Sequence, residues 1–425
     1  MSHMTDFIAD LADFITASPS SFHAATELGR RLSEAGYTRN EESAPWDASP
    51  GGHYIIRDGA LMAWLVPDGA DTSSAFRIVG THTDSPSLKL KPKPAIARAG
   101  WQSVGVEVYG GPLLNSWLDR DLAFAGRIVD KDGVVHLVRT GPIARVPQLA
   151  IHLDRKIGAE GLKLDPQQHT APIYAVGDEN ADILDIIART AGLTAADVTG
   201  HDIYAIDTQA PAVIGANEDF FAAGRLDNLS STHATLWALE NLAEHTRDIL
   251  VFAAFDHEEV GSSTRSGAAG PILADVLTRT AGALGASADD TAAMFARSAL
   301  LSVDAAHAVH PNYAERHDPE THPLLNAGPV LKVNSQQRYA TDAVGISLWN
   351  RAVAAAGIEA QVFVSNNAMP CGSTIGPISA TRLGLTTVDV GAPLLSMHSA
   401  RELAGTKDLP ALAAVIAAFY TAIDL

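Results

Sequence analysis

The sequence predicts an α/β fold interrupted by a β-rich module, and three observations support this prediction. Apolar runs typical of buried strands alternate with helical stretches in the first part of the chain and again after Asn217. Between residues 104 and 215, short alternating runs are broken by Gly and Pro, which is typical of β structure. At 425 residues, the chain is also longer than a single core usually allows, so we expect two domains.

The N-terminal piece is expected to begin with two helices and continue with strands. The first helix is indicated by apolar residues at helical spacing: Phe7, Leu11, Phe14 and Ile15. The elements expected next are a helix over 22–32 and strands over 61–66 and 77–81. The segment 88–94 alternates but contains Pro92 and Pro94, so we expect a connector rather than a central strand, and a first candidate for a domain boundary.

The middle module contains short strand-like runs over 104–109, 123–129 and 134–138 and one helix over 182–191. The α/β alternation then resumes, with helices expected over 229–243, over 343–356 and from Leu409, and strands over 249–255, 299–303, 361–365 and 385–390. The middle module therefore reads as an insertion between two pieces of one α/β domain.

Two adjacent glutamates, Glu258 and Glu259, follow the long apolar run at 249–255. The carboxyl end of such a strand delivers side chains to the edge of a sheet, where open α/β folds bind ligands. Two like charges are too costly to bury side by side unless a cation lies between them or one is protonated. The pair therefore predicts a metal site, in which one Glu binds metal and its neighbour accepts a proton from water.

Other candidate ligands follow predicted strands or precede a helix: His82, Asp304, His398 and Asp227. Imidazole and carboxylate groups suit Zn, Mn or Co, and one carboxylate can bridge two ions. Asp84 follows His82 by two residues, so we expect its carboxylate to fix the His82 tautomer. Each residue also has a plainer interpretation: a core or surface histidine for His82 and His398, and a helix N-cap for Asp227. His257 is interpreted as structural.

Composition excludes several classes of protein. The formal charge of −19 argues against nucleic acid and anionic membranes as partners, and no apolar run approaches the roughly 20 residues of a membrane span. The N-terminal region is acidic, so no signal peptide is expected. The single cysteine, Cys371, fits a reducing cytoplasm and is interpreted as a buried packing thiol. The sequence has no His-Glu-x-x-His, nucleophile elbow, Walker loop or dinucleotide fingerprint.

Eight segments, in their order along the chain, resemble the M18 metallopeptidases, whose best-known members are aspartyl aminopeptidases. They are HTDSP at 82–86, SWLDRDL at 116–122, IHLDR at 151–155, GRLDN at 224–228, DHEEVGS at 256–262, VDAAHAVHPN at 303–312, QRYAT at 337–341 and MHSARE at 397–402. The resemblance implies a three-layer α/β/α metallopeptidase domain with a mixed sheet, formed by residues 1–90 and 222–425. It also implies an inserted β-rich dimerisation domain at 91–221.

The resemblance further implies a co-catalytic pair of divalent ions, with Zn²⁺ favoured and Mn²⁺ or Co²⁺ as alternatives. Its implied metal ligands are Asp227 as the bridge, His82 and Asp304 on one ion, and Glu259 and His398 on the other. Glu258 would be the general base toward a metal-bridging water, with Asp84 in a supporting catalytic role. The free α-amino group of a substrate would bind one ion and limit cleavage to the first residue.

The resemblance implies three substrate-binding residues. Lys332 would face an acidic side chain, His307 would line the same pocket, and His152 would reach the site of a neighbouring subunit in dimers that build a tetrahedral dodecamer. The chain departs from better-known members at 151–163 and 328–336, the segments that would set side-chain preference and cross-subunit contact. On its own, a Lys in an alternating strand such as this would be solvated.

We therefore expect a cytoplasmic two-metal aminopeptidase that removes N-terminal residues, preferentially Asp or Glu, from peptides. Its expected partners are peptide substrates and copies of itself, with no nucleic acid and no membrane. One alternative is a two-metal amidohydrolase or deacylase that acts on small N-acyl compounds. A second alternative is a non-catalytic metal-binding cage protein.

Overall fold

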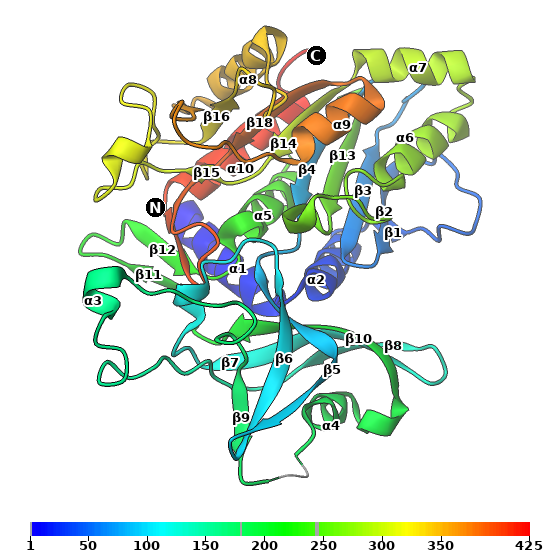
Figure 1. The fold of residues 1–425 in the computed structure, drawn as a ribbon. Helices are drawn as coiled ribbons and strands as arrows, with labels where there is room; N and C mark the ends of the chain where they lie inside the picture. Colours follow the sequence, from blue (N-terminus) through cyan, green and yellow to red (C-terminus); the bar gives the residue numbers. More distant parts are fainter. Residues whose placement is uncertain (1, 179–180, 243–245) are drawn as a thin grey trace.

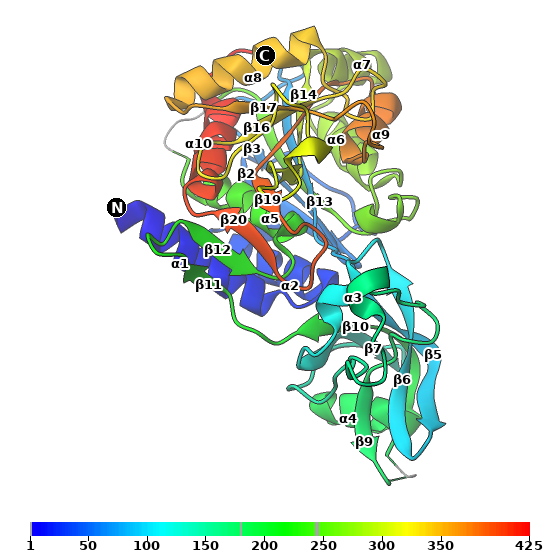
Figure 2. The same ribbon diagram turned by 60° about the vertical axis from the view of Figure 1, so that its left-hand side comes forward.

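The chain forms two bodies in a computed structural model that describes residues 2–178, 181–242 and 246–425. The larger body is a nine-stranded sheet between layers of helices, and a smaller β-rich body lies below it (Figures 1 and 2). Within the described ranges, no helix is both long enough and apolar enough to cross a membrane.

The nine-stranded sheet is mixed, as predicted. Its strands, in spatial order, are β1 (Thr38–Arg39), β2 (Gly51–Arg57), β3 (Ala60–Val66), β13 (Ile249–Phe255), β4 (Phe76–His82), β14 (Ala299–Val303), β18 (Thr386–Gly391), β16 (Val330–Val333) and β17 (Gln361–Val364). The central strands β13, β4, β14 and β18 run parallel, whereas β3 and β16 pair antiparallel with this group.

Helices cover both faces of this sheet because its central strands are apolar on both sides. Val79, Phe252 and Leu301 point into one core, and their sequence neighbours face the other, as the two-residue period of a strand requires. The helices on the first face are α1 (Ser2–Ala17), α2 (Ser21–Glu34), α5 (Leu226–Glu240), α8 (Ala343–Ala356) and α10 (Asp408–Thr421). Those on the second face are α6 (Ile272–Ala283), α7 (Ala288–Arg297) and α9 (Ile375–Leu383). The three-layer α/β/α prediction is confirmed.

The smaller body is built on an antiparallel six-stranded sheet. Its strands, in spatial order, are β8 (Val135–Arg139), β7 (Leu122–Asp130), β10 (Val198–Asp207), β5 (Ser87–Arg98), β6 (Trp101–Tyr109) and β9 (Ile173–Val176). Helix α4 (Ile183–Ala188) packs on it and begins at Asp182, whose side chain caps Leu184 N. The short helix α3 (Ile157–Glu160) lies outside this core.

The expectation of a connector at 88–94 is wrong, because this segment belongs to β5, an interior strand. Leu88, Lys89 and Leu90 pair with β6, and the pairing resumes only at Ala95. Pro92 and Pro94 lie in the unpaired stretch between Leu90 and Ala95, where no backbone N–H has to donate to β6. The prolines therefore mark a bulge in a strand rather than its absence.

A third, small sheet joins segments from both parts of the sequence. Its strands are β11 (Ala212–Ile214), β12 (Phe220–Ala223), β20 (Glu402–Gly405), β19 (Pro393–Leu395) and β15 (Ala306–His307). The strands of the six-stranded sheet lie between Ser87 and Asp207. Outside that range, β11 pairs with β12, and β12 pairs with β20 near the C-terminus. The domain limits at 91 and 221 stay a prediction.

The other expected elements are present, with ends that differ by a few residues. The helix expected over 229–243 is α5, which ends at Glu240, and residue 243 lies outside the described residues. Cys371 is only partly buried, against Ala306, Val330, Tyr339 and Phe363, so the expectation of a buried thiol is wrong. It lies in a loop at the edge of this cluster rather than on a strand.

Candidate metal centre

Three adjacent parallel strands deliver four of the predicted site residues to one edge of the sheet: His82, Glu258, Glu259 and Asp304. β4 ends at His82, β13 leads into the turn η4 (Glu258–Val260), and β14 leads into Asp304. In this sheet β13 and β14 flank β4, and Phe255 of β13 pairs with His82. Parallel neighbours end on the same side, so the shared strand direction brings these side chains together.

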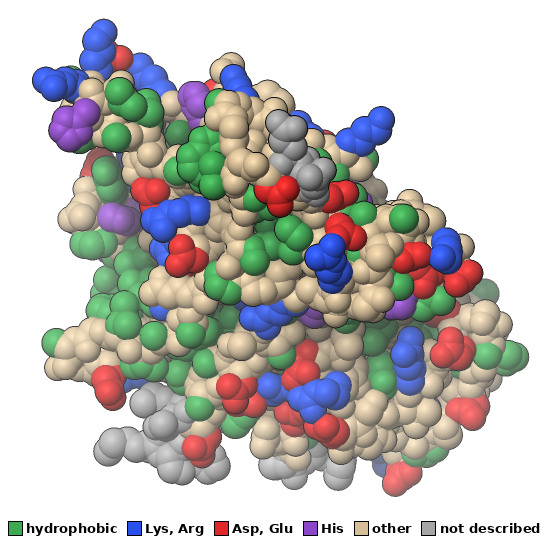
Figure 3. Space-filling view, turned by 90° about the horizontal axis from the view of Figure 1, so that it is seen from below, with side chains coloured by type: hydrophobic (Ala, Val, Ile, Leu, Met, Phe, Trp, Pro, Cys, Tyr) green, Lys and Arg blue, Asp and Glu red, His purple; other side chains and the backbone are tan. Residues whose placement is uncertain are grey.

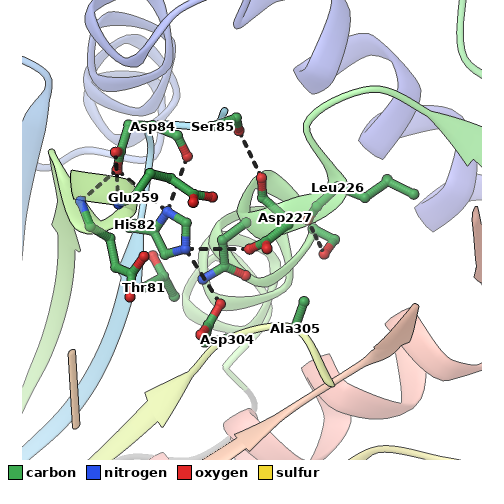
Figure 4. A network of polar contacts seen from close by, with 12 residues as sticks. Thr81, His82, Asp84, Ser85, Leu226, Asp227, Glu259, Asp304 and Ala305 are labelled. Carbon is green, nitrogen blue, oxygen red and sulfur yellow. Dashed lines mark hydrogen bonds and ion pairs between the residues drawn. The ribbon is translucent and has the colours of Figure 1, made fainter. Parts of the chain in front are cut away.

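Asp227 and His398 reach the same edge from other elements. Asp227 lies in the first turn of α5, next to Arg225 in the left-handed conformation, and its carbonyl oxygen accepts the Ser85 hydroxyl at 2.7 Å. His398 lies in the loop between β19 and β20, also with a positive φ. Figure 4 shows His82, Asp227, Asp304 and Glu259 pointing toward one another from separate elements.

The Asp227 carboxylate lies between the two histidines. Its Oδ1 is 3.4 Å from His82 Nε2, and its Oδ2 is 3.2 Å from His398 Nε2. His82 Nε2 is also 3.4 Å from Asp304 Oδ1, and His398 Nε2 is 3.4 Å from Glu259 Oε2. Ligand atoms of His82, Asp227 and Asp304 therefore lie within 4.8 Å of one another, as do those of Asp227, Glu259 and His398.

The chemistry of this cluster fits divalent cations. Asp227 Oδ1 and Glu259 Oε1 are buried and have no hydrogen-bond partner among the described residues. Burial, reinforced by Asp227, raises the pKa of Glu259 well above its usual range, and burial raises the pKa of Glu258 to about 8. So many buried carboxylates close together need a cation to compensate their charge. Imidazole and carboxylate groups together are a donor set that binds zinc.

The histidines compensate part of that charge. Although burial opposes it, hydrogen bonding to Asp227 raises the pKa of His398 to about 9. Although burial also opposes it, contacts with His398 and His82 hold the pKa of Asp227 well below its usual value. Both shifts come from the same contacts, so Asp227 is the carboxylate on which the two histidines converge.

Asp84 supports the site in a way that differs from the expectation. The His82 ring is fixed by the Asp84 backbone oxygen, 3.0 Å from Nδ1, while the nearer carboxylate oxygen is 3.4 Å away. The Asp84 carboxylate accepts hydrogen bonds from the backbone N–H groups of Glu258 and Glu259, at 3.0 and 3.2 Å. Its main contacts therefore hold the turn that carries both glutamates, and His82 Nε2 is left free to face the cluster.

Glu402 is a site residue that sequence reasoning missed. It is 2% exposed, its Oε2 accepts the Asp227 N–H at 3.0 Å, and its Oε1 accepts the His398 N–H at 2.7 Å. Burial, reinforced by Asp227, raises its pKa to about 8. The signal available in the sequence was its place in the MHSARE segment, four residues after His398.

The cluster opens onto a cavity of about 400 Å³. The cavity is lined by candidate ligands together with side chains from the surrounding strands and loops, among them Glu258, His307, Lys332, Tyr339, Ser373 and Met397. Lys332 is 1% exposed, and its Nζ lies 3.4 Å from Asp304 Oδ2 and 3.1 Å from the Ala305 carbonyl oxygen. The interpretation of Lys332 as a solvated residue is therefore wrong.

The remaining predicted residues lie apart from the cluster. His257 is turned away, with Nδ1 3.1 Å from the Thr264 hydroxyl. His152 is exposed in a turn of the inserted module, and the chain does not bring it to its own cavity. Any role for His152 at a metal centre would have to be played in another copy of the chain.

Comparison with known proteins identifies the class. The sequence model of the family described as Aminopeptidase I zinc metalloprotease (M18) matches residues 14–420. The chain therefore belongs to the M18 family and is a metallo-aminopeptidase, as its motifs indicated.

Individual relatives agree with this assignment. A "Probable M18 family aminopeptidase 2" of Streptomyces coelicolor is 50% identical over 416 residues, which is 96% of each chain. Among solved structures, the chain in an Ape4–Nbr1 complex has a TM-score of 0.94 at 33% identity, with 98% of this chain and 86% of that chain covered. The S. cerevesiae mApe1 dodecamer has a TM-score of 0.87 at 27% identity, with 99% and 97% covered.

Proposed function

We propose that this chain is a two-metal aminopeptidase that removes N-terminal residues, preferentially Asp or Glu, from peptides. The observation that carries the proposal is the position of Asp227, whose two carboxylate oxygens face two different histidines. His82 and Asp304 lie on one side of it, and Glu259 and His398 lie on the other. This arrangement suits one bridging carboxylate and two ligands for each ion.

Five side chains would hold the ions: His82, Asp227, Glu259, Asp304 and His398. Two zinc ions, when bound, would activate a water and polarise the peptide carbonyl. Glu258 lines the cavity beside them, and its backbone N–H is held by Asp84. The Glu258 carboxylate would accept the proton of the attacking water and return it to the leaving amine.

Two measurements test this assignment. Elemental analysis should find two zinc ions per chain, and Glu258→Gln should retain them while losing turnover, because an amide cannot accept the proton. Aminoacyl substrates should be cleaved and their N-acetylated equivalents should not, because the proposed mode of binding uses the free amine. Cleavage of the blocked compounds would instead support a deacylase, and one metal ion per chain would refute the dinuclear arrangement.

Lys332 and His307 support the preference for acidic residues. Both line the cavity, and Lys332 brings a buried cation into it. A substrate carboxylate would add a second partner for the Lys332 ammonium, which Asp304 already contacts at 3.4 Å. Because Lys332→Met also disturbs Asp304, the informative quantity is the ratio of kcat/KM for Asp and Ala substrates. We expect this ratio to fall at least tenfold in Lys332→Met and less in His307→Ala, and an unchanged ratio would refute the assignment.

Self-association through the inserted module is proposed from its surface and from the mApe1 dodecamer. Charged side chains of both signs and hydrophobic side chains are interspersed on the lower face of the molecule (Figure 3). Three apolar residues around His152 are exposed: Leu149 at 59%, Ile151 at 57% and Leu153 at 75%. A second copy would bury them and could receive His152 at its cavity, and dimers could build a tetrahedral dodecamer.

Mixed assemblies test whether His152 acts in a neighbouring subunit. His152→Ala and Glu258→Gln should each be nearly inactive alone. Co-assembly should restore activity, because a subunit with an intact Glu258 then receives His152 from its neighbour. If the mixture stays as inactive as its parts while both variants still assemble, His152 does not act across subunits.

A further inference from the structure

The segment 109–113, which begins at the last residue of β6, reaches from the inserted module into the metal cluster. It contains Tyr109, Gly110, Gly111, Pro112 and Leu113, and no role in the chemistry follows from these residue types alone. In the structure, this segment contacts three residues of the cluster: His398, Glu259 and Asp84. These three residues come from separate parts of the larger body.

His398 is held by the segment through both its ring and its backbone. The His398 Nδ1 lies 3.0 Å from the Gly111 carbonyl oxygen, which can only accept a hydrogen bond. The proton of a neutral His398 ring therefore resides on Nδ1, which leaves Nε2 as the ligand atom on the side where Asp227 and Glu259 lie. The Leu113 N–H donates to the His398 carbonyl oxygen at 2.9 Å, so the segment holds the backbone of His398 as well as its ring.

The segment also fits closely against the two acidic residues. A Cβ placed on Gly110, whose φ is +68, would lie 3.1 Å from Glu259 Cβ and 3.5 Å from Glu259 Oε2. The positive φ therefore favours glycine at this position, and an added Cβ would press Glu259 out of place by a few tenths of an ångström. The Tyr109 hydroxyl donates to Asp84 Oδ2 at 2.7 Å, and Asp84 in turn holds the Glu258 and Glu259 amides.

We propose that the segment 109–113 is a positioning element of the metal centre, through which the inserted module sets zinc affinity within its own chain. This inference rests on the proposed function, since it assumes that Glu259 and His398 bind metal. The inserted module would then contribute to the chemistry in addition to any part it has in assembly. Displacement of the segment would release the His398 ring and shift Glu259 together.

Zinc titration of the full-length protein tests the inference without reference to turnover. Gly110→Ala should weaken zinc binding by about 10–100-fold, the loss typical when a partner that orients a metal ligand is removed. Gly100→Ala is the matched control, because Gly100 also has a positive φ (+83) but its added Cβ would meet nothing within 4 Å. The control should bind zinc as the wild type does.

A second pair of variants covers the case in which Gly110→Ala fails to fold. Tyr109→Phe removes only the hydroxyl that contacts Asp84 and should weaken zinc binding severalfold. Tyr204→Phe removes a hydroxyl from the neighbouring ring, 5.2 Å away between centroids, and should have no effect. Cobalt-loaded protein provides a spectroscopic readout, since a change in the His398 or Glu259 ligand alters the visible absorption of the ion.

The outcomes separate this inference from the function on which it rests. If the wild type binds no zinc, the proposed metal centre is wrong. If the wild type binds two ions and both Gly110→Ala and Tyr109→Phe match it in affinity and cobalt spectrum, the metal centre stands and the role of the segment is refuted.

Discussion

Replacing Glu402 with glutamine should weaken zinc binding although Glu402 does not line the cavity. Its two carboxylate oxygens each accept one backbone N–H, from Asp227 at 3.0 Å and from His398 at 2.7 Å. A glutamine side chain has the same shape but only one acceptor oxygen, and its NH₂ group is a donor. In Glu402→Gln, the NH₂ group therefore faces one of these backbone N–H groups, donor to donor, at a position where Glu402 is 2% exposed.

The expected magnitude follows from that count. One buried N–H without a partner costs about 1–3 kcal/mol. If the Asp227 or His398 backbone moves to relieve this cost, the proposed ligand moves with it. A change of 1.4 kcal/mol corresponds to a factor of ten in affinity, so zinc binding should weaken by about 5–100-fold. The loss should appear in zinc affinity and in kcat/KM together.

Asp408→Asn is the matched control. The Asp408 carboxylate also accepts two backbone N–H groups, from Asn326 at 2.6 Å and Gly328 at 2.9 Å, and it is fully buried. Both variants should lose a similar amount of stability toward urea, but only Glu402→Gln should change the zinc dissociation constant measured with a competing chelator. Equal zinc affinity in both variants would refute the reasoning.

Three further predictions concern the base, the metal and pH. Glu258→Gln should lower kcat by about 10²–10⁴-fold with zinc content unchanged, and wild-type turnover would remove Glu258 as the base. Zinc at a hundred times its dissociation constant should raise Tm by about 3 °C per occupied site relative to chelated protein, and no shift in a calorimetric scan would argue against a native metal. Burial lowers the pKa of His23 from 6.5 to about 4, and the charges of Arg139 and Arg225 lower it further in the same direction. Between these pH values the unfolded chain binds more protons than the folded chain. The free energy of unfolding therefore falls as the pH drops from 6.5 to 4. This contribution is about 2 kcal/mol between pH 7 and 4.5. The free energy of urea unfolding should therefore depend less on pH in His23→Gln than in the wild type, and an equal dependence would show that the His23 ring is solvated.

The α/β layers and most residues of the candidate metal centre could be predicted from the sequence. Local periodicity indicates strands and helices: Val79 and Phe252 face one core, and their sequence neighbours Ile78 and Val251 face the other. The direction of parallel strands also made it possible to expect His82, Glu259 and Asp304 at one edge before any contact was known. These inferences need only neighbouring residues and the polarity of the chain.

Other features depended on contacts between distant parts of the chain. β5 is an interior strand in spite of Pro92 and Pro94 because its pairing skips the residues that cannot donate. Lys332 is buried, and its ammonium group contacts Asp304 and the Ala305 carbonyl oxygen. The alternating pattern of its own strand does not predict these contacts.

The sequence by itself therefore determined which residue types meet at the strand ends, since strand polarity is a local property. Only the tertiary structure decided what holds them there. Gly111 contacts His398 across 287 positions of sequence, and Glu402 contacts Asp227 across 175. One partner in each of these hydrogen bonds is a backbone group, which its residue type does not reveal, and the bonds exist only once the inserted module and the C-terminal loop have packed against the sheet.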